Sequence, residues 1–81
     1  MEETINTIKG FILSEFLPGE DPSALTETTP LITGGILDSL ATLRLVTFLS
    51  ETFNVEVAPH EMGVEHLDTL PDIAKLVQSK L

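Results

Sequence analysis

The chain has 81 residues, of which 42% are hydrophobic, so it is long enough for one hydrophobic core but not for two. Its 13 acidic and 4 basic residues give a formal net charge of -9, which opposes binding to nucleic acids and to anionic lipid surfaces. We therefore expect one domain over residues 1–81, a monomer that meets positively charged protein surfaces in short encounters.

The first predicted element is an amphipathic helix over roughly residues 3 to 16. Its apolar residues recur at steps of three and four: Ile5, Ile8, Ile12 and Phe16. Glu2 and Glu3 stand where acidic side chains stabilise a helix N-terminus, and Pro18 and Gly19 follow its end.

A long loop follows, from Pro18 to Gly35. It holds three prolines, three glycines and many small polar residues, with isolated apolar anchors at Leu25, Leu31 and Ile32. Long loops in small domains are usually either functional or disordered. The loop therefore directs attention to its far end, where Asp38 and Ser39 begin the next helix.

The second long helix starts near Ser39 and ends at Asn54. One face carries the stripe Leu40, Leu43, Val46, Leu49 and Phe53, which we expect to be core. Leu45 and Phe48 lie off this stripe. They either broaden the buried face or form an apolar contact for a partner.

An extended connection, a short helical turn over residues 61 to 66 and a last helix complete the chain. Thr69 is a candidate N-cap for this helix, whose apolar face holds Ile73, Leu76 and Val77. No segment alternates like a strand over a useful length. The fold expected is an all-α four-helix bundle with three longer helices, one short helix and a long loop between the first two.

Asp38, Ser39 and Leu40 lie where the loop turns into the second helix. This position holds a serine hydroxyl on a rigid element and leaves it exposed, as a modification site requires. The alternative is that Asp38 or Ser39 only caps the helix.

The stretch from Gly34 to Leu40, with serine directly after aspartate, resembles the attachment motif of the acyl carrier protein family. The resemblance extends over nearly the whole chain, through Phe53 to Val57, Leu67 to Leu70 and the last helix. It implies that a phosphopantetheinyl transferase, using coenzyme A and magnesium, joins phosphopantetheine to Ser39 through a phosphodiester. Asp38 and Leu40 belong to the same motif.

The chain has no cysteine, so the thiol of a thioester has to come from such an arm. Tethering an acyl or aminoacyl group raises its effective concentration at each partner enzyme. The resemblance implies a non-catalytic phosphoprotein that serves an acyl- or aminoacyl-activating enzyme and downstream synthases or transferases. Fatty acid, polyketide and nonribosomal peptide biosynthesis are the pathways that such carriers serve.

The second helix departs from the pattern of fatty acid synthase carriers, which usually carry several acids there. Here Arg44, Thr47 and Ser50 stand on that helix, and Glu51 remains. We expect Leu40, Arg44 and Glu51 to take part in partner recognition, and a specialised pathway rather than fatty acid synthesis.

The remaining signals indicate no other chemistry. His60 and His66 are six residues apart and point to different helix faces, so we expect no metal site. No secretion signal or membrane span is visible, and we expect a cytoplasmic protein. No nucleophile, base and oxyanion set predicts an enzyme. The alternative function is an unmodified acidic helical adaptor.

Overall fold

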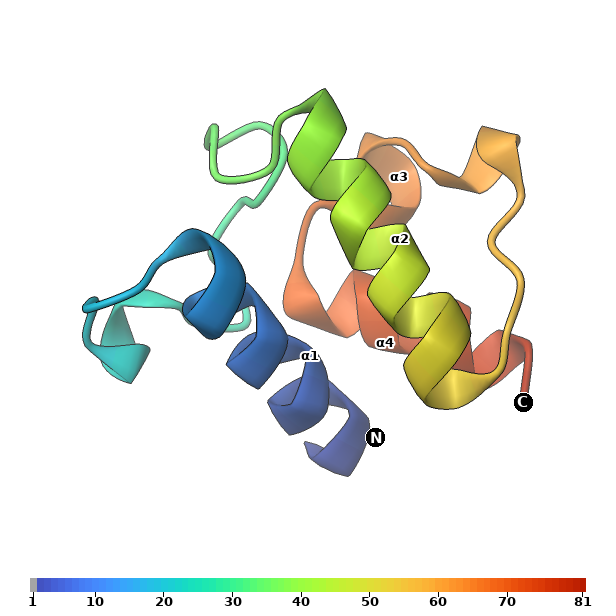
Figure 1. Cartoon of the computed structure of the whole chain (residues 1–81), viewed down its shortest axis with the longest axis horizontal. Helices are drawn as coiled ribbons and strands as arrows, with labels where there is room; N and C mark the ends of the chain where they lie inside the picture. Colours follow the sequence, from blue (N-terminus) through green and yellow to red (C-terminus); the bar gives the residue numbers. More distant parts are fainter. Residues whose placement is uncertain (1) are drawn as a thin grey trace.

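Three longer helices and one short helix form the bundle, as the sequence predicts (Figure 1). The computed structural model describes residues 2–81, and no strand occurs among them. Helix α4 packs against α1 and α3, and α1 also contacts α2. The helices are α1 (Glu2–Phe16), α2 (Ser39–Phe53), α3 (Val64–Leu67) and α4 (Leu70–Ser79), with short 3-10 turns at Pro22–Ala24 and Pro59–Glu61.

Side chains and backbone geometry set the helix ends. Asp38 caps α2 by accepting a hydrogen bond from the Ala41 amide at 2.8 Å. Thr69 caps α4 by accepting one from the Asp72 amide at 3.3 Å. Asn54 ends α2 in the left-handed conformation, with φ 56°. The short helix lies later than expected, because the 3-10 turn at Pro59–Glu61 and the extended Gly63 precede it.

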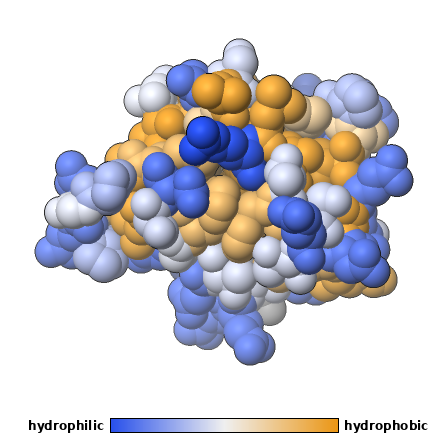
Figure 2. Space-filling view, viewed as in Figure 1, coloured by the Kyte–Doolittle hydropathy of each residue, from blue (hydrophilic) through white to orange (hydrophobic). Residues whose placement is uncertain are grey.

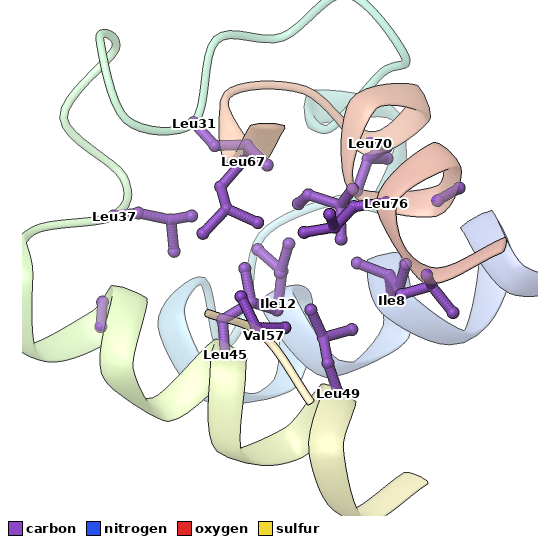
Figure 3. Close-up of a cluster of buried hydrophobic side chains, with 14 of the residues drawn as sticks. Ile8, Ile12, Leu31, Leu37, Leu45, Leu49, Val57, Leu67, Leu70 and Leu76 are labelled. Atoms are coloured by element: carbon purple, nitrogen blue, oxygen red, sulfur yellow. The ribbon is translucent and has the colours of Figure 1, made fainter. Parts of the chain in front are cut away.

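The long loop contributes directly to the core. Leu25, Leu31 and Leu37 are buried as completely as the core residues of the helices, whereas Ile32 is half-buried. Each buried leucine contributes about 1.5–3 kcal/mol of hydrophobic free energy, so these contacts hold the loop against the bundle. Figure 3 shows Leu31 and Leu37 pointing inward among side chains from the helices, which include Ile8, Ile12, Leu45, Leu49, Leu67, Leu70 and Leu76.

The predicted buried face of α2 is wrong in its first turns. Leu40 and Leu43 are 63% and 54% exposed, whereas Ala41, Leu45 and Leu49 are buried. Apolar residues occur on more than one face of α2, so periodicity alone did not fix its rotation. Leu45 is core and therefore offers no contact to a partner.

Aromatic side chains pack against one another where α1 contacts α2. The rings of Phe11 and Phe48 stack with centroids 4.0 Å apart, and Phe16 and Phe53 meet this pair edge-on. Phe48 thus belongs to the packing between the helices, although it stays half-buried.

The start of α1 and the end of α4 lie together. The Gln78 side-chain amide donates a hydrogen bond to the Thr4 hydroxyl at 2.9 Å. The start of α1 and the end of α4 lie at the lower side of Figure 1, and α2 begins at the upper side. Within residues 2–81, no helix has the length and apolar character needed to cross a membrane.

Candidate modification site

Ser39 is the first residue of α2 and is exposed to solvent. The capping role that the sequence left open between two residues belongs to Asp38, whose side chain accepts the Ala41 amide. The Asp38 carbonyl also accepts hydrogen bonds from the amide and the hydroxyl of Thr42. Within the described part of the chain, no protein group hydrogen-bonds the Ser39 hydroxyl.

An open groove of about 530 Å³ begins at Ser39 and runs between the start of α2 and the start of α3. Its walls are mostly apolar: Ile32, Leu37, Leu43, Met62 and Val64 line it, with Asp38, Ser39, Thr42 and Gly63. Figure 2 shows apolar surface at the upper side of the view, where α2 begins, and also over the middle of the same face. The groove suits a flexible chain with an apolar group, held at the serine.

Two glycines shape the turn before the site. A Cβ atom on Gly34 would overlap the carbonyl oxygen of Pro30, and Gly35 has φ 86°. The Leu37 amide then donates to the Leu31 carbonyl at 2.8 Å and closes the turn. The glycines of the motif therefore build a tight, hydrogen-bonded turn.

Asp68, at the junction of α3 and α4, anchors this loop. Its Oδ1 accepts the amides of Ile32 at 2.8 Å and Thr33 at 2.9 Å, and the Thr33 hydroxyl donates to its Oδ2 at 3.1 Å. Its carbonyl accepts the Leu31 amide at 2.6 Å. These hydrogen bonds, above all that from the Thr33 amide, hold the pKa of Asp68 below its ordinary value of 3.8.

A second carboxylate holds the other wall of the groove. Glu61 accepts the Ala58 amide at 2.9 Å and pairs with Lys80 at 2.7 Å, directly before Met62. The hydrogen bond from Lys80, followed by that from Ala58, lowers the pKa of Glu61 from its ordinary 4.5.

The predicted recognition residues are all exposed but do not share the groove of Ser39. Leu40 and Arg44 border a small hollow of about 170 Å³ beside Phe16. Arg44 and Glu51 border another, of about 300 Å³, over the contact between α1 and α2. Arg44 also pairs with Glu15 of α1 at 3.7 Å.

Sequence reasoning missed several residues of the site. Leu43 was assigned to the core and instead lines the groove, together with Met62 and Val64. In the sequence, Asp68 stands out only as part of the segment Leu67 to Leu70 that carries the family resemblance. Glu15 lay outside the predicted surface, and only the packing of α1 on α2 brings it to Arg44.

No protein-family model matches the chain, and no curated protein sequence matches it. The fold is similar to a chain in a solved structure described as the crystal structure of FAD-dependent dehydrogenase, with a TM-score of 0.78 and 31% sequence identity. The match covers 86% of this chain and 97% of that chain. The two chains belong to one family. They are similar in length as well as in fold.

Proposed function

We propose that this protein is an acyl carrier protein that holds acyl or aminoacyl groups as thioesters on a phosphopantetheine arm at Ser39. The observation that carries the proposal is the position of Ser39, an exposed hydroxyl on the first turn of α2 at the mouth of an apolar groove. Because Asp38 performs the capping, the serine is not needed for it. This division of roles favours the carrier over the alternative adaptor.

Arm attachment follows from the chemistry of a serine hydroxyl and coenzyme A. The Ser39 oxygen forms a bond to the phosphorus that bears the pantetheine, and the bond between the two linked phosphates breaks. The serine proton passes to a base of the transferase, and the adenosine bisphosphate half of coenzyme A leaves. Magnesium on the transferase stabilises the charge of the phosphates. Within the carrier, α2 fixes the position of the nucleophilic oxygen.

Intact mass after incubation with coenzyme A, magnesium and a broad-specificity transferase tests the proposal. We expect one phosphopantetheine on the folded wild-type protein and none on Ser39→Ala, while circular dichroism shows the same helix content in both. The absence of any addition to the folded wild type would favour the adaptor. Addition to Ser39→Ala would place the attachment elsewhere.

A second proposal concerns the partner. The family member in the structure described as FAD-dependent dehydrogenase is similar in length to this chain. FAD-binding domains of the dinucleotide type are built around parallel strands, and residues 2–81 here form helices and loops alone. We therefore propose that this chain acts beside a FAD-dependent dehydrogenase rather than as one, and presents its thioester-bound group for oxidation.

In that reaction the carried group would lose a proton to a base of the dehydrogenase and a hydride to its FAD, which would leave a new double bond in the group and a reduced flavin. Mixing the loaded carrier with such an enzyme should lower the mass of the carried group by two hydrogen atoms and bleach the flavin absorbance. The same group on free pantetheine is the control. Equal rates with both substrates would show that the protein surface takes no part in recognition.

The surface of α2 supports a specialised pathway over fatty acid synthesis. Its exposed side presents Leu40, Leu43 and Arg44 near Ser39, with the first acid of the helix at Glu51. Such a surface suits partners with apolar rather than strongly basic docking sites. An activating enzyme that loads the arm in the cytoplasm and a downstream transferase or synthase complete the proposed set of partners, all meeting a monomeric carrier.

A further inference from the structure

We infer that Asp68 is a positioning residue for Ser39: it fixes the loop from Leu31 to Leu37 and thereby holds the serine in the place that the transferase meets. This inference rests on the proposed attachment of the arm to Ser39. Asp68 lies outside the attachment motif and is 29 positions away from the serine in the sequence. The link between them is a chain of hydrogen bonds.

The first step joins Asp68 to the middle of the loop. Its carboxylate accepts the amides of Ile32 and Thr33 and the hydroxyl of Thr33, so a single side chain satisfies three donors. Its backbone carbonyl accepts a fourth, the Leu31 amide. Hydrogen bonds to an ionised acceptor are stronger than neutral ones, and three of the four that converge on Asp68 end on its carboxylate.

The second step runs from the anchored segment to the serine. Leu31 is held at both of its backbone groups, since its amide binds Asp68 and its carbonyl accepts the Leu37 amide. Leu37 is buried and directly precedes Asp38, the cap of α2. Movement of the anchored segment therefore shifts the backbone directly before Ser39.

Asp68 also connects the two walls of the groove. Ile32, which Asp68 holds, stands on one wall, and Gly63 and Val64 of the α3 region stand on the other. Asp68 follows the last residue of α3, so its hydrogen bonds tie the two walls together. Loss of the carboxylate should widen the groove as well as loosen the serine.

The experiment measures kcat/KM for arm attachment with coenzyme A and a transferase, at a temperature where circular dichroism shows every variant folded. We expect Asp68→Ala to lower kcat/KM by about tenfold or more, because small displacements of a reacting group cost that much. Asp68→Asn keeps one acceptor oxygen, so its kcat/KM should lie between those of Asp68→Ala and the wild type. Thr33→Val should lower kcat/KM less than Asp68→Ala does. Thr33→Ser keeps the hydroxyl and should have the kcat/KM of the wild type.

The matched control is Thr4→Val, which removes a hydrogen bond between α1 and α4 at the other end of the molecule. It should lower the melting temperature without changing kcat/KM. Hydrogen exchange gives an independent readout: Asp68→Ala should speed exchange at the Ile32, Thr33 and Leu37 amides and leave the amides of α1 unchanged.

Wild-type kcat/KM in Asp68→Ala would overturn the inference, and so would a loss no larger than that of Thr4→Val. If Asp68→Ala fails to fold, the kcat/KM values of Asp68→Asn and Thr33→Val test the inference by the same criterion. If the transferase fails to load the wild type, the proposed function itself fails. Hydrogen exchange then still shows whether Asp68 holds Leu37.

Discussion

Gly34 lies against the carbonyl oxygen of Pro30 so closely that no side chain fits between them. Gly34→Ala should therefore displace the turn before Ser39 and destabilise the protein by about 1–3 kcal/mol, the usual cost of forcing an added methyl group into filled space. Urea unfolding followed by circular dichroism measures the change. Arm attachment should slow in the same variant, because the turn leads into α2.

Gly10→Ala is the control for that substitution. Gly10 is exposed in the interior of α1, and nothing lies within 4 Å of the place its Cβ would occupy. Alanine there should raise the free energy of unfolding by about 0.5–1 kcal/mol. A Gly34→Ala protein as stable as the wild type would contradict the close approach.

Substitutions of the neighbouring residues Asp38 and Ser39 should affect stability to different extents. Asp38→Ala removes the cap of α2 and should cost about 1 kcal/mol, whereas Ser39→Ala should change the free energy of unfolding by a few tenths of that amount. Thermal and urea unfolding of the two variants give the comparison. A larger loss of stability in Ser39→Ala than in Asp38→Ala would show that Ser39, and not Asp38, caps α2.

The ion pair between Glu61 and Lys80 predicts a loss of stability in acid. The pKa of Glu61 is lowered in the folded state, mainly by the hydrogen bond from Lys80, with a small contribution from the charge of His60. Such a group stabilises the fold at pH values above its unfolded pKa, and this contribution disappears as pH falls through the folded pKa. Urea midpoints for wild type and Glu61→Gln should therefore converge below pH 4.5 and differ at neutral pH. A constant difference over the whole range would exclude this linkage.

Arg44 provides a test of partner choice. Its cation stands on the exposed side of α2, and Arg44→Glu should speed transfer with fatty acid synthase enzymes and slow it with the carrier's own partners. Both effects should shrink as salt is added, because exposed charges are screened.

Glu15→Gln is the matched control for Arg44→Glu. It removes the partner of Arg44 but keeps the cation, so it should not produce the gain with fatty acid synthase enzymes. Transfer rates that stay the same for Arg44→Glu at every salt concentration would remove Arg44 from the recognition surface.

The end of α2 and the start of α4 were predictable from the sequence because local chemistry sets them. Asn54 adopts the left-handed conformation that asparagine tolerates, and Thr69 accepts the amide three residues on, as an N-cap does. The rotation of α2 was not predictable in the same way. Leu40 and Leu43 fit a helical stripe as well as Ala41 and Leu45 do, and only the packing of the loop and the other helices decides between them.

The candidate site likewise has one part that the sequence predicts and another that it does not. Ser39 stands in a contiguous motif, so its place at the start of α2 could be predicted. The hydrogen bonds from Thr33 to Asp68 join residues 35 positions apart, and no periodicity or capping rule connects them. The groove likewise arises from segments that meet only in the folded chain, with Leu43 on one side and Val64 on the other.

The hydrogen bond between Thr4 and Gln78 joins the start of α1 to the end of α4 on the side away from the start of α2. A tag, a surface anchor or a neighbouring domain linked to either end therefore sits away from Ser39 and its groove. Immobilised carriers can present their arms outward, and several copies can be strung along one polypeptide with every serine still open to a passing enzyme.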